Sequence, residues 1–154
     1  MIRLCLIDSA GIARTEVFAG DYLDEPQITI ISPTRDFYES LLPKFRNKLN
    51  FHWALEALEE NSYSSKDDIS DETTLSKTLD DATDDTSAHN QSSIVFLLET
   101  DEKQKFLFTG DAGRDAFNHV PQTLLGKVKD VTWMKVPHHG SKHNLDSTII
   151  KHVN

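Results

Sequence analysis

The chain has 154 residues, of which 38% are apolar, and a net charge of −9. This length fits one domain with a core. The negative charge argues against a nucleic-acid surface held by charge alone, although bound cations can support nuclease chemistry, so nucleic acid stays an open partner. The single cysteine excludes a disulfide framework and a cysteine-rich zinc knuckle. We expect a cytoplasmic protein, because a chain with one cysteine suits a reducing compartment. The sequence shows neither a signal peptide nor a run of membrane-spanning length.

The first part of the chain predicts two strands and a helix. Residues 2–7 form a brief apolar run, and residues 28–31 are largely β-branched, so both fit strands. A helix is expected to follow, with Ser32 as its N-cap and Pro33 at its first position. Its apolar residues recur at helical spacing to about residue 48: Phe37, Leu41, Leu42 and Phe45.

The composition changes between residues 59 and 85. Aspartate and glutamate stand there among serine and threonine, with few apolar side chains. Such a segment buries too little surface to offset the entropy lost on ordering, so we expect a mobile linker. The alternative is a contact arm for a basic partner. One domain therefore divides into a strand and helix (1–58), an acidic linker or insert (59–88) and a remaining part (89–154).

That remaining part predicts a hairpin, a helix and a last strand. Residues 93–99 are continuously apolar, as in a strand covered on both faces, and 92–109 read as a hairpin. A helix bearing Ala116, Phe117 and Val120 is expected after residues 110–113, and Pro121 ends it. Leu124 and Leu125 suggest a further short helix. Residues 131–136 fit a strand, and 141–154 fit a loop leading into a helix. The order of elements is typical of a layered α/β fold.

Asp111 follows the second hairpin strand and precedes the expected helix. Ligand sites in layered α/β folds favour the carboxyl ends of strands, and a carboxylate there can coordinate one metal or bridge two. The alternative is that Asp111 caps the helix, since aspartate is a preferred N-cap residue.

His138 and His139 directly follow the last strand, between Pro137 and Gly140. Adjacent histidines on an extended or turning chain point in different directions, so we expect at most one of them to bind a metal directly. The other can orient a ligand or handle a proton. The alternative is a pair of partly exposed loop histidines.

Other polar residues lie near these motifs in the sequence. His143 could support the site, although a surface position is also open. Asn90, Ser92 and Ser93 precede the hairpin and could either shape a loop or support the site through hydrogen bonds.

Three segments together resemble the metallo-β-lactamase-fold hydrolases: residues 90–98 (Asn-Gln-Ser-Ser-Ile-Val-Phe-Leu-Leu), 107–113 (Leu-Phe-Thr-Gly-Asp-Ala-Gly) and 135–141 (Lys-Val-Pro-His-His-Gly-Ser). The likeness is to the bacterial branch that includes the metallo-β-lactamase-like domain of the DNA-uptake channel protein. Residues 31–42 also look like part of such domains.

The resemblance implies an αββα sandwich with a metal site at one edge, between its two sheets. It implies that Asp111 bridges two metal ions, usually zinc with manganese possible, and that His138, with His139 as the alternative, binds the second ion. Catalysis would involve Asp111, His138 and His139. The implied activity is metal-assisted hydrolysis, with phosphodiesters the leading substrates and other small substrates possible.

The sequence departs from the family in one large respect. None of its seven histidines forms the family's principal motif, His-x-His-x-Asp-His. The resemblance therefore implies a partial sandwich, a fragment or split protein that lacks the first half and the last strand and helix. A second chain or an N-terminal half would supply the other metal ligands. The alternative function is a non-catalytic binding or interaction module derived from that fold.

Overall fold

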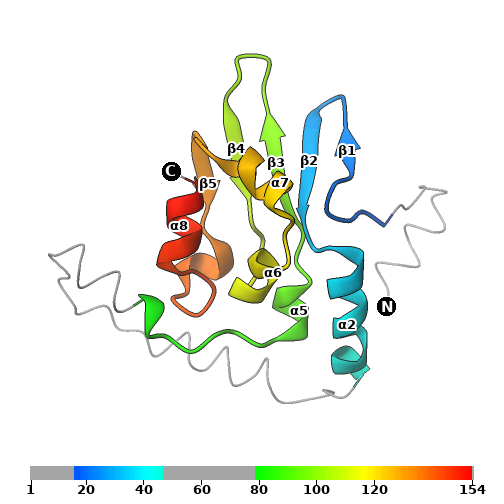
Figure 1. The fold of residues 1–154 in the computed structure, drawn as a ribbon, viewed down its shortest axis with the longest axis vertical. Coiled ribbons are helices and arrows are strands. Elements are labelled where there is room, and N and C mark those ends of the chain that lie inside the picture. The colour runs from blue at the N-terminus through cyan, green and yellow to red at the C-terminus, as the bar shows by residue number, and fades with distance from the viewer. Residues whose placement is uncertain (1–15, 47–78, 154) are drawn as a thin grey trace, which may run out of the picture.

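The computed structural model describes residues 16–46 and 79–153. They form an α/β unit with one five-stranded mixed sheet in the order β1-β2-β3-β4-β5 (Figure 1). The strand predicted at residues 2–7 lies outside the described residues. The elements are β1 (Tyr22–Leu23), β2 (Gln27–Ser32), α2 (Arg35–Arg46), α5 (Ala88–Gln91), β3 (Val95–Glu99), β4 (Lys105–Phe108), α6 (Arg114–Asn118), α7 (Gln122–Leu125), the 3-10 turn η1 (Gly126–Val128), β5 (Trp133–Lys135), the turn η2 (Pro137–Gly140) and α8 (Ser147–Val153).

The pairing of the strands brings two strand ends together. The first four strands are antiparallel neighbours, and the predicted hairpin is confirmed as β3 and β4, with Phe96 opposite Phe108. The chain then passes through α6 and α7, which lie in front of the sheet in Figure 1, and returns as β5. Because β5 pairs with β4 in parallel, both strands end at the same edge of the sheet.

The helix predicted after the second strand is present, but its start was predicted wrongly. It begins at Arg35, and the Oγ1 of Thr34 accepts a hydrogen bond from the Phe37 N–H at 3.3 Å, as an N-cap does. Ser32 belongs to β2 instead, where its hydroxyl donates to the carbonyl of Ala116 at 2.9 Å. Phe37 is buried, whereas Leu42 is 42% exposed, so the buried face is narrower than the apolar pattern suggested.

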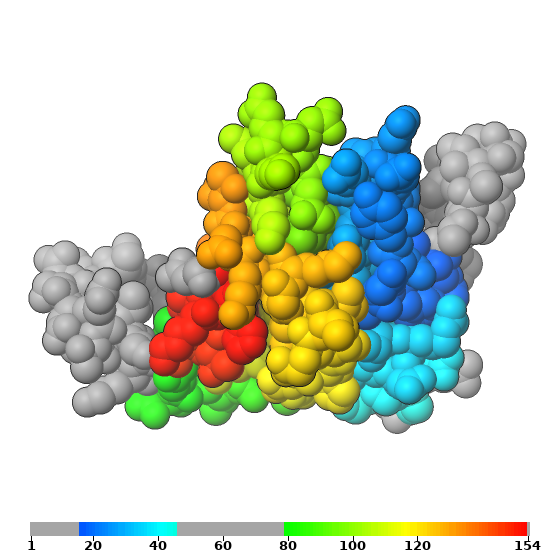
Figure 2. Space-filling model, turned by 45° about the horizontal axis from the view of Figure 1, so that its top comes forward, coloured from blue at the N-terminus to red at the C-terminus, as the bar shows by residue number. Residues whose placement is uncertain are grey.

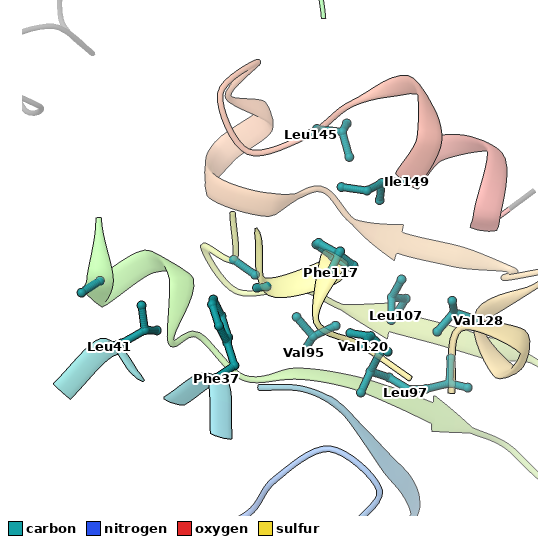
Figure 3. Close-up of a cluster of buried hydrophobic side chains, with 14 residues drawn as sticks. Phe37, Leu41, Val95, Leu97, Leu107, Phe117, Val120, Val128, Leu145 and Ile149 are labelled. Atoms are coloured by element: carbon teal, nitrogen blue, oxygen red, sulfur yellow. The ribbon is translucent and has the colours of Figure 1, made fainter. Parts of the chain in front are cut away.

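The core lies on one face of the sheet. Val95, Leu97 and Leu107 point into it and are completely buried. Side chains from α6 and from the C-terminal segment cover them, among them Phe117 and Ile149 (Figure 3). Each large apolar side chain buried in this way contributes about 1.5–3 kcal/mol. In Figure 2, α8 (red) lies beside the segment with α6 and α7 (yellow), and α8 contacts η1 in the structure.

The opposite face of the sheet carries an aromatic row that is only half-buried. Phe96 stacks on Phe108 with ring centroids 4.7 Å apart, and Trp133 lies 5.6 Å from Phe108. Trp133 is 48% exposed. The expectation that β3 is covered on both faces was therefore wrong for the described residues: Val95 and Leu97 are fully buried, but Phe96 and Leu98 are not.

The end of the acidic segment is tied to the rest of the unit. Residues 59–78 lie outside the described residues. In residues 79–88, the Asp85 N–H donates to the carbonyl of His143 at 3.0 Å, and both carboxylate oxygens of Asp80 accept hydrogen bonds from Ser147. These contacts place this stretch, expected to belong to a linker, against the C-terminal segment. Among the described helices none is long and apolar enough to cross a membrane.

Candidate functional site

The candidate site is built at the common end of β4 and β5. The N–H of His138 donates to the carbonyl of Gly110 at 3.2 Å, which joins the two strand ends through their backbones. Two side chains reinforce the junction: Thr109 donates its hydroxyl to the Lys135 carbonyl at 2.6 Å, and the Lys135 ammonium donates to the Gly110 carbonyl at 2.8 Å. The strand ends that carry the Asp and His motifs therefore lie side by side in the backbone.

Asp111 is half-buried and does not cap a helix. Helix α6 begins at Arg114, and the residue in its N-cap position is Gly113. The backbone carbonyl of Asp111 accepts a hydrogen bond from Asn144 at 3.2 Å. Its carboxylate makes no hydrogen bond or ion pair with the described part of the chain. The capping alternative is therefore wrong, and the carboxylate remains available for a ligand.

The two histidines differ in their surroundings. Both lie in the left-handed backbone region, with φ of 42° at His138 and 56° at His139, which is uncommon for residues other than glycine. Their ring centroids are 6.0 Å apart and the ring planes are inclined by 58°, so the side chains point in different directions, as expected. His139 is exposed, whereas the side chain of His138 is only 19% exposed and faces a polar network.

The polar network surrounds Nδ1 of His138. The side-chain oxygen of Asn144 lies 3.3 Å from this nitrogen, and the side-chain nitrogen of Asn90 lies 3.4 Å from it. An oxygen of the Asp85 carboxylate lies 3.7 Å away. Asn90 thus contacts His138 and donates to the Asp85 carboxylate at 2.7 Å, whereas its role in a functional site stays a prediction. Ser92 instead shapes the turn, because its hydroxyl donates to the His89 carbonyl.

Asp85 is the residue that joins the network together. Its side chain is 10% exposed and accepts three hydrogen bonds, from the Ser87 N–H at 2.8 Å, the Asn90 amide at 2.7 Å and the Asn144 amide at 2.9 Å. Sequence reasoning missed both Asp85 and Asn144. The only signal was local: an aspartate two residues before a serine can form the Asx turn seen here. Nothing in the sequence near Asn144 indicates its role.

Arg114 holds together the two segments that carry Asp85 and Asn144. Its side chain is 8% exposed, and it pairs with the Asp84 carboxylate at 2.9 Å. The guanidinium also donates to four backbone carbonyls, at Leu79, Ala82, Lys142 and Leu145. The fork of donors in arginine suits such a role better than a lysine would. Sequence reasoning missed this residue as well.

The side chains of three other histidines, His143, His119 and His89, contact residues other than His138. His143 is half-buried, and its Nδ1 lies 2.7 Å from the carbonyl of Thr83. His119 stacks on Phe37, and His89 packs edge-on against Phe45. His143 therefore stabilises the loop that ends at Asp85. His52 lies outside the described residues.

The described residues provide only part of a metal centre. Carboxylate and imidazole, the side-chain types of Asp111 and His138, are donors that zinc and manganese accept. A catalytic zinc takes three protein ligands, however, and the described residues contain no group of three histidine, cysteine or carboxylate side chains that could hold a metal. Asp111 and His138 thus carry two of the donor types that a zinc site uses, and a complete site would need further ligands.

A pocket of about 160 Å³ lies elsewhere, between α6, α7 and α8, and its walls include Phe117, Leu125 and Ile149. Neither Asp111 nor His138 lines this pocket.

Comparisons of this chain with protein-family models, with curated proteins and with solved structures found no match.

Proposed function

We propose that this chain is a metal-dependent hydrolase of the metallo-β-lactamase type, carrying part of the metal centre. The observation that supports it is the position of Asp111, a half-buried carboxylate without a partner in the described residues, beside His138 at the joined ends of β4 and β5. Zinc, or manganese in its place, is the proposed metal, and phosphodiesters are the proposed substrate class. The α/β unit would be part of an αββα sandwich.

The backbone at the histidines also supports a functional site. Left-handed conformations at residues with a β-carbon are costly and persist where the surrounding structure enforces them, frequently at functional sites. Here two such residues, His138 and His139, stand next to each other, directly before Gly140 with φ of 85°. The hydrogen bond from His138 to Gly110 holds this turn against Asp111.

The proposal includes a source for the remaining ligands. Two donors fall short of the three that a catalytic zinc takes. We propose that a second chain, or residues of this chain outside the described part, completes the set, and that the described unit has no hydrolytic activity by itself.

Metal analysis of the purified chain tests the site. Zinc and manganese content and affinity would be measured for the wild type, Asp111→Ala and His138→Ala. Asp115→Ala and His152→Ala are matched controls, since they remove the same residue types from α6 and α8. We expect both site variants to lose bound metal and both controls to keep it. Equal metal content in all five proteins would refute the metal role of Asp111 and His138.

Turnover of a chromogenic phosphodiester, measured with added zinc or manganese, tests the activity. The same variants serve as controls. Metal binding and turnover are measured separately. If the chain binds metal through Asp111 and His138 but hydrolyses no ester, the metal site is supported and the hydrolase activity is refuted.

A second candidate function is a non-catalytic binding module that keeps the fold of a hydrolase. The absence of a three-ligand group in the described residues favours it. It predicts that metal content is low and that Asp111→Ala and His138→Ala leave it unchanged.

A further inference from the structure

Asn144 has a side-chain orientation that its partners determine. It is completely buried, and its amide nitrogen donates to an oxygen of Asp85 at 2.9 Å and to the backbone carbonyl of Asp111 at 3.2 Å. Both of these partners can only accept hydrogen bonds. An amide nitrogen has two hydrogens, so both are used, and the other terminal atom of Asn144 must be the oxygen.

This oxygen faces Nδ1 of His138 at 3.3 Å. It can only accept a hydrogen bond, and no other donor from the described residues reaches it. A buried acceptor without a donor is unfavourable, so the pair is satisfied when His138 carries its hydrogen on Nδ1.

Asn90 offers the competing arrangement. Its amide nitrogen lies 3.4 Å from Nδ1 of His138 and could donate to it if that nitrogen carried the lone pair. Asn90, however, already donates to Asp85 at the shorter distance of 2.7 Å and is less buried than Asn144. The Asp85 carboxylate, 3.7 Å from Nδ1, also favours a hydrogen there electrostatically.

We infer that Asn144 and Asp85 are positioning residues that hold His138 in the Nδ1–H tautomer, so that His138 acts through Nε2. Carboxylates and carbonyl oxygens commonly orient metal-binding histidines in this way. The same two residues also fix the other half of the site, because Asn144 holds the backbone of Asp111. The purpose of this positioning rests on the proposed function, whereas the tautomer itself is a property of the metal-free protein.

Proton–nitrogen correlation NMR of the histidine rings, recorded without metal at alkaline pH, tests the inference. The two neutral tautomers give different patterns of coupling to the ring nitrogens, and a His138→Gln spectrum identifies the His138 signals. We expect the wild type to show the Nδ1–H form. A wild-type spectrum with the hydrogen of His138 on Nε2 would overturn the inference.

Two variants separate the contributions of the asparagines. Asn144→Ala removes the acceptor, so the Nε2–H form should gain population. Asn90→Ala removes only a donor and should leave the Nδ1–H form dominant. Loss of that form in Asn90→Ala but not in Asn144→Ala would contradict the assignment.

Zinc affinity adds the functional readout. Loss of a residue that orients a metal-binding histidine weakens metal affinity by about 10–100-fold, and we expect this for Asn144→Ala compared with Asn90→Ala. If the wild type binds no zinc yet shows the Nδ1–H tautomer, the proposed function fails while the tautomer assignment stands. If zinc binds and the hydrogen is on Nε2, the function stands and the assignment fails.

Discussion

The side-chain amide of Gln91 occupies the space in which residue 113 would carry a β-carbon. Gln91 is buried, and its amide joins two segments: the oxygen accepts from the Ala116 N–H at 2.9 Å, and the nitrogen donates to the Asp85 carbonyl. Gly113 is therefore required by packing, because any side chain there displaces the residue that links α6 to Asp85.

Gly113→Ala is expected to destabilise the protein. The added methyl group would force the buried Gln91 to move, and overpacking of this kind costs about 1–3 kcal/mol. Gly126→Ala is the matched control, because a β-carbon at Gly126 meets nothing within 4 Å. Chemical denaturation of both variants measures the difference. Equal stability of the two variants would contradict the packing role of Gly113.

Thr29→Val is expected to leave stability unchanged or to raise it by about 1 kcal/mol. Thr29 is 2% exposed, and its hydroxyl has no hydrogen-bond partner within the described residues. Valine has nearly the same shape without the unsatisfied group. Thr109→Val is the control with the opposite expectation, since the Thr109 hydroxyl donates to Lys135 at 2.6 Å. Thermal unfolding compares the stabilities of the two variants. If Thr29→Val is less stable than Thr109→Val, the prediction is wrong.

Arg114→Lys is expected to cost on the order of 3 kcal/mol, because one ammonium cannot replace the bonds to four carbonyls and Asp84. Asp84→Ala should cost less than about 1 kcal/mol, since Asp84 is half-exposed. Hydrogen exchange should show faster exchange of the Asp85 amide in Arg114→Lys. Unchanged exchange there would show that Arg114 does not hold this segment.

Stability should fall at acid pH partly through Asp80. Hydrogen bonds from the Ser147 backbone N–H, and then from its hydroxyl, lower the pKa of Asp80 below its usual value of 3.8. A carboxyl whose pKa is lowered by folding stabilises the protein above its unfolded pKa, and this contribution is lost as the pH falls through the folded pKa.

Unfolding curves between neutral and acid pH check this dependence. Asp80→Asn should weaken the loss of stability on acidification. Asp81→Asn removes the same charge from the same segment without touching Ser147 and is the control for net charge. A profile of Asp80→Asn that matches the wild type would exclude this contribution.

Elements with a strong local pattern could be predicted from the sequence. The hairpin, the apolar β2 and the helix bearing Phe37 and Leu41 each follow from a pattern within a few residues, whereas the alternating burial of β3 was not predicted. The two-residue strand β1 was missed because Tyr22 and Leu23 are exposed and too few to form a pattern. The start of α2 was misplaced because Ser32 and Thr34 are both suitable caps, and only the contact of Ser32 with Ala116 decides between them.

The sequence by itself determined the donor types at two strand ends, Asp111 and the His138–His139 pair, because ligand chemistry belongs to a side chain. Only the tertiary structure decided that these ends meet, through the parallel pairing of β4 and β5, and that Asp85 and Asn144 surround His138. Asp85 and Asn144 are 59 residues apart, so no local pattern records their bond. The physical reason is that each side chain has its hydrogen-bonding groups by itself, whereas its hydrogen-bond partners depend on which distant segments pack against it.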